Sequence, residues 1–237
     1  MKQPAIIQAL LQRRRYDERS LPTVLWHAVR NRVWYRREKR IYVYEAERIQ
    51  HVPDSFLLQR NRLEDLRYYE RTVSWQMSPD AYQQEARLRL AKGEHLYTLV
   101  DQGRLVHYAW LATHHVRGED RTVGQVFFAP PDSAALYDHY THPLARRRGL
   151  YFKALCQLLH DVPVLTKAKR AYIYVYADNS PSRHVIEKIG FRYVGSLVEE
   201  RRLLAVRRFP VSAGGEFRTA LLEESRQEHR LLTAKGP

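Results

Sequence analysis

The sequence predicts a mixed α/β fold in which helices cover a sheet, with an N-terminal helical extension before the domain. Segments rich in β-branched and aromatic residues alternate with segments whose apolar residues recur at helical spacing. A strand–helix–strand unit occupies residues 134–177, near the middle of the chain. The chain has 237 residues, of which 44% are hydrophobic, so one large domain can bury a core of its own.

The composition excludes several classes of protein. Cys156 is the only cysteine, which excludes an internal disulfide and fits a reducing compartment. The chain has no uncharged apolar run of roughly 18 residues, the length that a membrane-spanning helix needs. The N-terminus also lacks the charged, apolar and small-residue order of a secretory signal. We therefore expect a cytoplasmic protein without a transmembrane segment.

The net charge of +14 is the unusual bulk property, with 40 Lys and Arg against 26 Asp and Glu. A positive surface favours polyanions, such as cofactor phosphates, nucleic acid or an anionic membrane. The basic residues are spread along the chain and do not form one tail. A basic protein without a charge-selected partner is therefore an equal alternative.

The N-terminal part of the chain predicts mainly helices. Residues 1–37 are expected to be a basic extension with helices at 5–15 and 22–35, because apolar residues recur there at helical spacing. Packing of this extension against the domain is favoured over contact with a membrane surface. Residues 41–46 have strand composition, and the charged stretch 56–75 has a helical pattern.

Caps and turns delimit the next elements. A helix is expected at 78–92, because it begins with a capping serine and a proline and is followed by glycine. Residues 95–101 and 105–113 predict a hairpin around a Gln-Gly turn. The charged stretch 115–132, which contains Gly and Pro, predicts a loop around one short strand at 123–128.

The strand–helix–strand unit is the clearest part of the pattern. Residues 134–141 predict a strand, and residues 147–159 predict a helix with one apolar stripe. Cys156 lies near that stripe, which favours a core position over a nucleophile. Residues 171–177 alternate tyrosines with Ile and Val, which favours sheet packing over base stacking. A helix at 182–189, strands at 191–198 and 203–209, and a polar tail at 211–237 with one weak helical patch follow.

A cationic turn leads from the strand into the helix of this unit. Pro143 breaks the strand, and Arg146, Arg147 and Arg148 come directly before Gly149. The first amides of a helix lack internal partners, and the helix dipole is positive at this end. The turn therefore suits a phosphate group, and the glycine would let the backbone approach it closely.

Two motifs together resemble the GNAT N-acetyltransferase superfamily. Residues 146–151 read Arg-Arg-Arg-Gly-Leu-Tyr after a strand and a proline, similar to the family's Arg/Gln-x-x-Gly-x-Gly/Ala. Residues 179–182 read Asn-Ser-Pro-Ser, and Gly-Phe follows at 190–191, similar to the family's Asn-x-x-Ala/Ser and Gly-Phe. The order of the elements over residues 41–209 resembles the family as well.

The resemblance implies a fold, a cosubstrate and a set of residues. The fold is a mixed, mostly antiparallel central sheet with flanking helices over residues 38–210. The reaction is transfer of an acetyl group from acetyl-CoA to a primary amine. No metal is implied, and no cluster of His, Cys and Asp has metal-ligand spacing. The residues assigned to acetyl-CoA are His139, Thr141, Arg146, Arg147, Arg148, Gly149, Leu150, Tyr151, Asn179 and Ser182.

Two residues depart from the family motifs. Tyr151 stands where the family usually has Gly or Ala, so the phosphate loop is bulkier on one side. Ile186 stands seven residues after Asn179, where the family most often has a tyrosine that protonates the departing thiolate. Another acid or solvent must then take this step, or the step is lost.

The catalytic candidates come from the end of the strand at 134–141. By resemblance, the backbone amides of His139, Tyr140 and Thr141 face the thioester. Asp138 is the candidate general base, directly or through water, and a salt-bridged structural aspartate is an equal alternative. Tyr140 shares its face by alternation and is the candidate replacement acid, whereas His139 lies on the opposite face.

The acceptor stays open among a small amine, an amino sugar and a peptide amine. A small molecule is favoured, and the positive charge favours one that carries phosphate or carboxylate, such as a nucleotide-linked sugar. A non-catalytic CoA-binding or nucleic-acid-binding module is the alternative, which Ile186 and the net charge support. Nucleic acid is not the favoured partner. A structural protein that uses its N-terminal helices, and a homodimer, are also left open.

Overall fold

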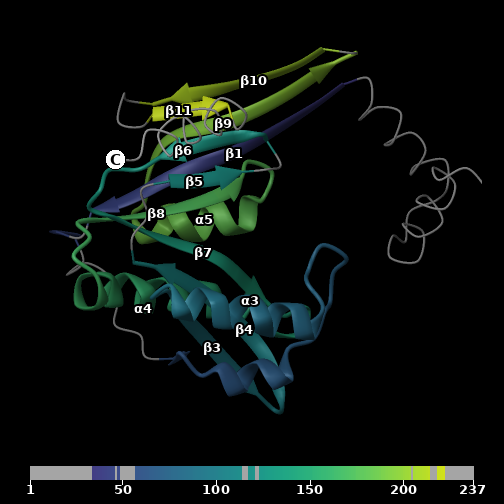
Figure 1. Ribbon diagram of the computed structural model, residues 1–237, viewed down its shortest axis with the longest axis vertical. Helices are drawn as coiled ribbons and strands as arrows, with labels where there is room; N and C mark the ends of the chain where they lie inside the picture. Colours follow the sequence, from purple (N-terminus) through teal and green to yellow (C-terminus); the bar gives the residue numbers. More distant parts are fainter. Residues whose placement is uncertain are drawn as a thin grey trace, which may run out of the picture.

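The computed structural model describes residues 34–45, 47–48, 57–113, 117–120, 123–203, 205–213 and 218–221 (Figure 1). The strands of its large sheet are β1 (Trp34–Glu45), β2 (Gln59–Arg60), β3 (His95–Asp101), β4 (Arg104–Ala112), β7 (Ser133–Thr141), β8 (Arg170–Tyr176), β9 (Arg192–Arg202) and β10 (Ala205–Ser212). A small sheet contains β5 (Arg117–Asp120), β6 (Gln125–Phe128) and β11 (Arg218–Leu221). The helices are α3 (Pro79–Ala91), α4 (Leu150–Leu165) and α5 (Ser180–Ile189), with 3₁₀ turns η2 (Leu63–Tyr68) and η3 (Pro143–Ala145).

The large sheet has eight strands in the order β10-β9-β1-β8-β7-β4-β3-β2. Neighbouring strands run antiparallel except β7 and β8, which are parallel. The parallel pair is joined through α4, as a crossover connection requires. The predicted mixed, mostly antiparallel sheet with a central strand–helix–strand unit is therefore confirmed.

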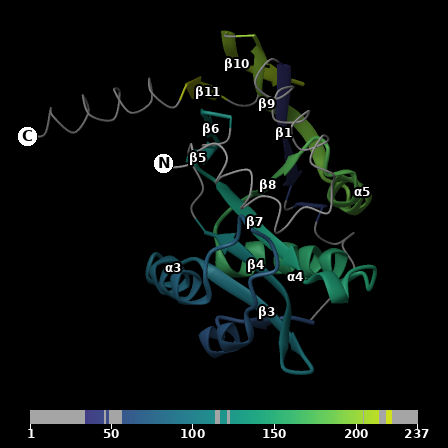
Figure 2. The ribbon, with the colours of Figure 1, turned by 90° about the vertical axis from the view of Figure 1, so that its right-hand side faces the viewer.

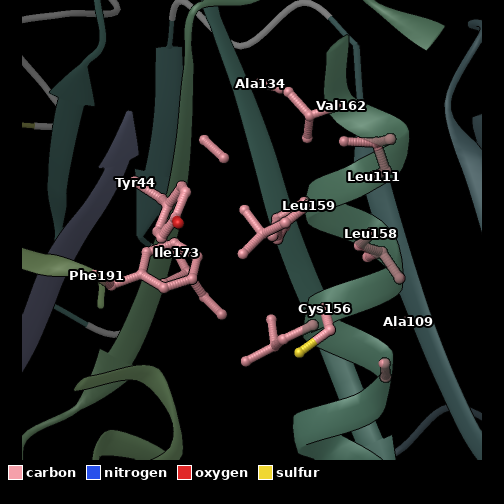
Figure 3. Packing of buried hydrophobic residues seen from close by; sticks show 14 of the residues in the cluster. Tyr44, Ala109, Leu111, Ala134, Cys156, Leu158, Leu159, Val162, Ile173 and Phe191 are labelled. Atoms are coloured by element: carbon pink, nitrogen blue, oxygen red, sulfur yellow. The ribbon is translucent and has the colours of Figure 1, made fainter. Parts of the chain in front are cut away.

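The helices lie on both faces of the sheet. Figure 2 shows α3 on one side of β4 and β7, with α4 and α5 on the other. The face under α4 carries the largest core cluster, to which β4, β7 and β8 contribute (Figure 3). The face under α3 carries a second cluster of mostly aromatic side chains. The small sheet covers part of the outer face of β1, β8 and β9, where Phe127 packs against Tyr172.

The apolar stripe predicted for the middle helix forms the core. Leu155, Leu158 and Leu159 of α4 are fully buried, and Leu158 and Leu159 point towards the sheet in Figure 3. Cys156 lies beside them and is also buried, as a small core residue. The prediction for Cys156 is confirmed, because burial raises the pKa of its thiol to about 11 and suppresses the reactive thiolate.

Local signals in the sequence place several element ends. The hydroxyl of Ser78 accepts a hydrogen bond from the backbone of Ala81 at 3.4 Å and caps α3. Gln102 and Gly103 both have left-handed backbone angles, with φ of 50° and 71°, as a two-residue hairpin turn requires. Gly190 ends α5 with φ of 106°. These predictions are confirmed.

One helix prediction is wrong and another extends too far within the described residues. The last two residues of the predicted helix 22–35, Trp34 and Tyr35, belong to β1, which pairs there with the charged end of β9. The rest of that helix, and the helix predicted at 5–15, lie outside the described residues. The predicted helix 56–75 contains only η2, because Gln59 and Arg60 pair with β3 and Asn61 turns left-handed with φ of 59°. The cross-strand pairing outweighs the helical pattern of these charged residues.

Other segments differ in extent. The short strand predicted at 123–128 inside the loop 115–132 is confirmed as β6, and the same stretch contains a second strand, β5, that was not predicted. The tail predicted at 211–237 contains the end of β10 and all of β11, which pairs with β6. The helix predicted at 147–159 begins later, because Gly149 is left-handed with φ of 70°. It also continues through Pro163 to Leu165, since Val162 packs into the core.

Candidate active site

A cleft opens where the two parallel strands separate. β7 and β8 pair from Ser133 to Leu136 and from Arg170 to Ile173, and no pairing continues beyond these residues. The remaining parts of both strands line a cavity of about 700 Å³. The loop before α3, the helix α3 itself and β4 close its other side. We call this the first cavity.

A second cavity of about 670 Å³ lies at the beginnings of α4 and α5. The end of β7 and the cationic turn after it supply one wall, and the first turns of the two helices supply the others. The residues expected to bind acetyl-CoA that line it are His139, Thr141, Arg146, Arg147, Gly149, Leu150, Tyr151, Asn179 and Ser182. The structure thus brings together most of the set that the two motifs suggested.

The two cavities share part of their walls. His139, Tyr151, Asn179 and Ser182 line both of them. The side-chain oxygen of Asn179 accepts a hydrogen bond from the Ser182 amide at 3.2 Å and caps α5. A molecule in one cavity and a molecule in the other would meet at these four residues.

A β-bulge shapes the end of β7 at this junction. Tyr108 of β4 lies opposite Tyr140, and Trp110 lies opposite Tyr137. Two residues of β7, Asp138 and His139, therefore face one residue of β4, and Asp138 has φ of 52°. A bulge of this kind leaves backbone groups unpaired and turns side chains out of the regular alternation.

Asp138 lies on the α3 side of the sheet and lines the first cavity. Its Oδ2 atom accepts a hydrogen bond from Arg89 of α3 at 2.8 Å. Arg89 also pairs with Glu85 at 2.9 Å and lies over the rings of Trp110 and Tyr137. Burial disfavours the charged guanidinium, but the neighbouring Tyr137 and Asp138 outweigh it, so the pKa of Arg89 is raised.

Tyr140 is on the same side of the sheet as Asp138, as alternation predicted. Its ring stacks on Tyr108 with centroids 5.5 Å apart and meets the edge of Trp75 at 5.9 Å. Its hydroxyl is hydrogen-bonded to the Thr72 hydroxyl in the loop before α3. Tyr140 lines the second cavity but is not among the residues of the first.

His139 lies on the opposite side, against the beginning of α4. Its ring is 6.1 Å from that of His107 and 5.2 Å from that of Tyr151. Burial and the nearby His107 hold the pKa of His139 well below its usual value. Burial alone lowers the pKa of His107 to about 3. Both imidazoles are therefore neutral, and both ring nitrogens of His139 are buried without a hydrogen-bond partner among the described residues.

The cationic turn divides its three arginines. Arg146 and Arg147 line the second cavity, and Arg147 has left-handed φ of 65°. Arg148 is not among the lining residues and instead pairs with Asp101 at 2.8 Å. A Cβ at Gly149 would meet no atom within 4 Å, so its side of the turn is open. The turn and the two helix N-termini form a positive environment that suits phosphate groups.

Ile186 is fully buried in the core cluster under α4. It cannot take part in proton transfer, because its side chain is apolar and closed off from solvent. Tyr151, the other departure from the family motif, lines both cavities at their junction, as Ser182 does. Burial raises the pKa of Tyr151, and the nearby Ser182 side chain offsets part of that increase.

Sequence reasoning missed most of the first cavity. Its aromatic walls come from Tyr69, Trp75, Tyr82, Tyr108, Tyr137, Tyr174 and Tyr176, and its other charged residues are Lys39, Arg89 and Glu94. These residues are spread over seven tenths of the described chain, and no short spacing connects them. The alternating tyrosines of β8 were the one available signal, and Tyr172 and Tyr174 do pack against the small sheet as expected.

No group of three or more His, Cys, Asp and Glu side chains in the described part of the chain is placed to hold a metal ion. Among the described helices, none is long and apolar enough to cross a membrane.

Comparison with known proteins gives the following matches. A family model described as an acetyltransferase (GNAT) domain matches residues 47–192, more than half of the chain. No curated protein sequence matches. A GNAT-family acetyltransferase from Colwellia psychrerythraea is 13% identical, with a TM-score of 0.48, and the match covers 76% of this chain and 57% of that one.

Two further solved structures are similar at the same low level. A GCN5-related N-acetyltransferase from Sphaerobacter thermophilus is 9% identical with a TM-score of 0.43, covering 84% of this chain and 56% of that one. The Salmonella typhimurium protein yncA, a candidate acetyltransferase solved with its cofactor acetyl-CoA, is 14% identical with a TM-score of 0.42. That match covers 78% of this chain and 95% of yncA.

Proposed function

The chain belongs to the GNAT acetyltransferase family, and from this premise we propose that it transfers an acetyl group from acetyl-CoA to a primary amine. The observation that carries the proposal is the meeting of two cavities at His139, Tyr151, Asn179 and Ser182. A two-substrate transfer needs the reacting atoms of both molecules in contact at one point. Two separate cavities with one shared wall provide that arrangement.

The second cavity is the one we assign to acetyl-CoA. Arg146, Arg147 and the N-termini of α4 and α5 supply positive charge and free amides for the phosphates. The open side of Gly149 lets a phosphate approach the backbone. The thioester end would then reach the junction, where the bulge at Asp138 and His139 leaves backbone groups of β7 unpaired.

The first cavity is the one we assign to the amine. Asp138 lines it, and we assign this residue the role of general base, directly or through one water molecule. Only Oδ2 of its carboxylate is engaged by Arg89, and among the described residues no donor contacts Oδ1. That oxygen can take the proton that the amine must lose before it attacks the thioester.

The acceptor that we favour is a small molecule such as an amino sugar. Flat aromatic side chains make up much of the first cavity, and aromatic rings pack well against the apolar faces of sugar rings. Lys39 in the same wall and the net charge of +14 support an acceptor with a phosphate or carboxylate group. The lone, buried Cys156 fits a reducing compartment, so we place the protein in the cytoplasm.

Calorimetric titration with acetyl-CoA tests the assignment of the second cavity. Gly149→Glu adds bulk and negative charge at the phosphate turn and should abolish saturable binding. Gly103→Glu is the matched control, because this glycine also has φ near 70° and open space at its Cβ but lines neither cavity. Equal loss in both variants would mean that the effect is one of folding, and unchanged binding in Gly149→Glu would overturn the assignment.

A panel of amines, followed by release of free CoA thiol, tests the reaction. Amino sugars with and without phosphate, polyamines and a lysine-containing peptide cover the acceptor classes. Acetylation of neutral or cationic amines much faster than of anionic ones, without a salt effect, would overturn the anionic acceptor. Binding of acetyl-CoA without transfer to any amine would favour the alternative, a non-catalytic CoA-binding module, which the buried Ile186 motivates.

A further inference from the structure

Acetyl transfer leaves a thiolate that has to be protonated, and the donor has to lie where the two substrates meet. Four residues line both cavities, and of these only His139 and Tyr151 titrate. The side-chain oxygen of Asn179 is used as a helix cap. The choice of proton donor at the junction is therefore between an imidazole and a phenol.

The imidazole of His139 does not fit this role. Burial and the nearby His107 hold the pKa of His139 well below its usual value, so the ring is not a charged imidazolium that could act as the acid at neutral pH. Tyr140 is the other phenol that lines the second cavity, but it does not line the first, and its hydroxyl is held by Thr72. Ile186 is apolar and fully buried.

We propose that Tyr151 is the general acid that protonates the departing CoA thiolate, an inference that rests on the proposed acetyl transfer. Its side chain lines both cavities at their junction. The residue stands in the phosphate turn, at the beginning of α4, and so on a different helix from Ile186. The bulky residue in this turn thereby supplies the group that Ile186 lacks.

The surroundings of Tyr151 hold the ring in one place. The ring of His139 meets its edge at 5.2 Å and 70°, and the ring of His107 lies 6.5 Å away. A fixed ring lowers the entropic cost of presenting the hydroxyl to the sulfur atom. Ser182, in the first turn of α5, lines the same junction of the cavities.

The protonation state also suits a donor. Burial raises the pKa of Tyr151, so the phenol is protonated at neutral pH. The Ser182 side chain lowers that pKa in part, so it favours the charged form of the phenol. Ser182 therefore stabilises the phenolate that forms when the proton is given away.

The step balances in atoms and electrons. The amine nitrogen forms a bond to the carbonyl carbon, the C–S bond breaks, and its electron pair stays on sulfur. The Tyr151 proton moves to that sulfur and gives the free CoA thiol. The proton that the amine loses goes to Asp138 and then to water, and the phenolate regains a proton from water after the thiol has left. No oxidant, reductant or metal takes part.

The first test compares three Tyr→Phe variants, each of which removes one hydroxyl and keeps the aromatic ring. Tyr151→Phe should lower kcat by about 10²–10⁴, the usual contribution of a positioned acid, with the Kd for acetyl-CoA within a few-fold of the original. Tyr193→Phe is the control, because this residue lines neither cavity and its hydroxyl bonds Ser196. Tyr140→Phe tests the rival phenol. Thermal unfolding of each variant separates loss of the fold from loss of chemistry.

The second test uses a readout that a structural role would not move. Fluorinated tyrosines of increasing acidity at position 151 keep the shape of the ring and lower the pKa of the phenol. The alkaline fall of kcat should then move to lower pH in step with the acidity of the residue. A fall that stays in place would overturn the proposal even if Tyr151→Phe is slow.

The remaining outcomes are distinct. Loss of acetyl-CoA binding in Tyr151→Phe would overturn the role of Tyr151 as the acid, and so would a retained kcat. Loss of kcat in Tyr140→Phe, together with a change in the alkaline fall of kcat in that variant, would transfer the role to Tyr140. If the original protein acetylates no amine, the proposed function fails separately. In that case the slow hydrolysis of acetyl-CoA still requires thiolate departure, and its rate in Tyr151→Phe decides the inference by itself.

Discussion

Arg89 of α3 and Asp138 of β7 form an ion pair of 2.8 Å at the wall of the first cavity. The pair joins the helix to the bulged end of the strand, and the guanidinium lies over two aromatic rings at 5.1 Å. Asp138 is thus both a partner in the packing of α3 and the carboxylate that faces the acceptor. If Asp138 acts on the acceptor as well as in packing, then Asp138→Asn and Glu85→Gln, which each change one carboxylate partner of Arg89, should differ in their effect on kcat.

Asp138→Asn should lower kcat by about 10²–10⁴, because the amide cannot accept the amine proton. Its oxygen can still accept the hydrogen bond from Arg89, so we expect the free energy of unfolding to fall by only about 1 kcal/mol. Glu85→Gln removes the other partner of Arg89 on α3 without touching either cavity. Equal kcat in the two variants, with equal loss of stability, would reduce Asp138 to a structural residue.

The division of the three arginines gives a second prediction. Arg146→Ala and Arg147→Ala should each weaken acetyl-CoA binding about tenfold, because a hydrogen bond to a charged group contributes about 1.5–3 kcal/mol. Arg148→Ala removes the same charge but only breaks an exposed pair with Asp101, so its effect should be much smaller. Calorimetry at two salt concentrations measures both the affinities and their salt dependence. A weakening by Arg148→Ala as large as by the other two would mean that net charge alone governs binding.

Local signals carried much of the fold prediction. The caps at Ser78 and Asn179, the left-handed turn at Gln102 and the apolar stripe around Leu158 depend on neighbouring residues, and the sequence displays them directly. The second cavity was predictable for the same reason, since the motifs at 146–151 and 179–182 begin the two helices that line it.

The parts that were missed depend on partners distant in the chain. The stretch 56–75 has a helical pattern, but its pairing with β3 uses residues some forty positions away. The bulge at Asp138 arises from pairing with β4, and alternation alone does not reveal it. The aromatic wall of the first cavity is assembled from α3, β4 and β8, so no single window contains it.

Cys156 gives a probe of opening around α4. With burial raising its pKa to about 11, roughly one thiol in a thousand is ionised at pH 8 in the folded protein. A maleimide or disulfide reagent should therefore react only through opening of the core, far more slowly than with the unfolded chain. Because this is the only cysteine, the measured rate reports one site. Complete labelling of the folded protein within the time taken by the chain in urea would contradict the burial of α4.

The neighbouring imidazoles of His107 and His139 make stability depend on pH. In the unfolded chain a histidine binds a proton near pH 6.5, whereas burial lowers the pKa of His107 to about 3 and that of His139 well below its usual value. At a pH between the unfolded and the folded pKa values of these histidines, the unfolded state binds more protons than the folded state. The free energy of unfolding therefore falls as the pH falls below 6.5. The neighbours of the pair are the Thr141 hydroxyl and the ring of Tyr151, and no carboxylate among the described residues contacts either ring to offset the cost.

Each buried imidazole should cost about 1 kcal/mol of unfolding free energy between pH 6.5 and pH 5.5, and the pair about twice that. Urea unfolding at pH 7.5, 6.5 and 5.5 measures the slope in a range where most carboxylates stay ionised. His107→Gln should remove about half of it, whereas His184→Gln, a change at an exposed residue of α5, should leave it unchanged. A stability that is flat over this range, or a slope that His107→Gln does not reduce, would mean that the two imidazoles gain protons in the folded protein.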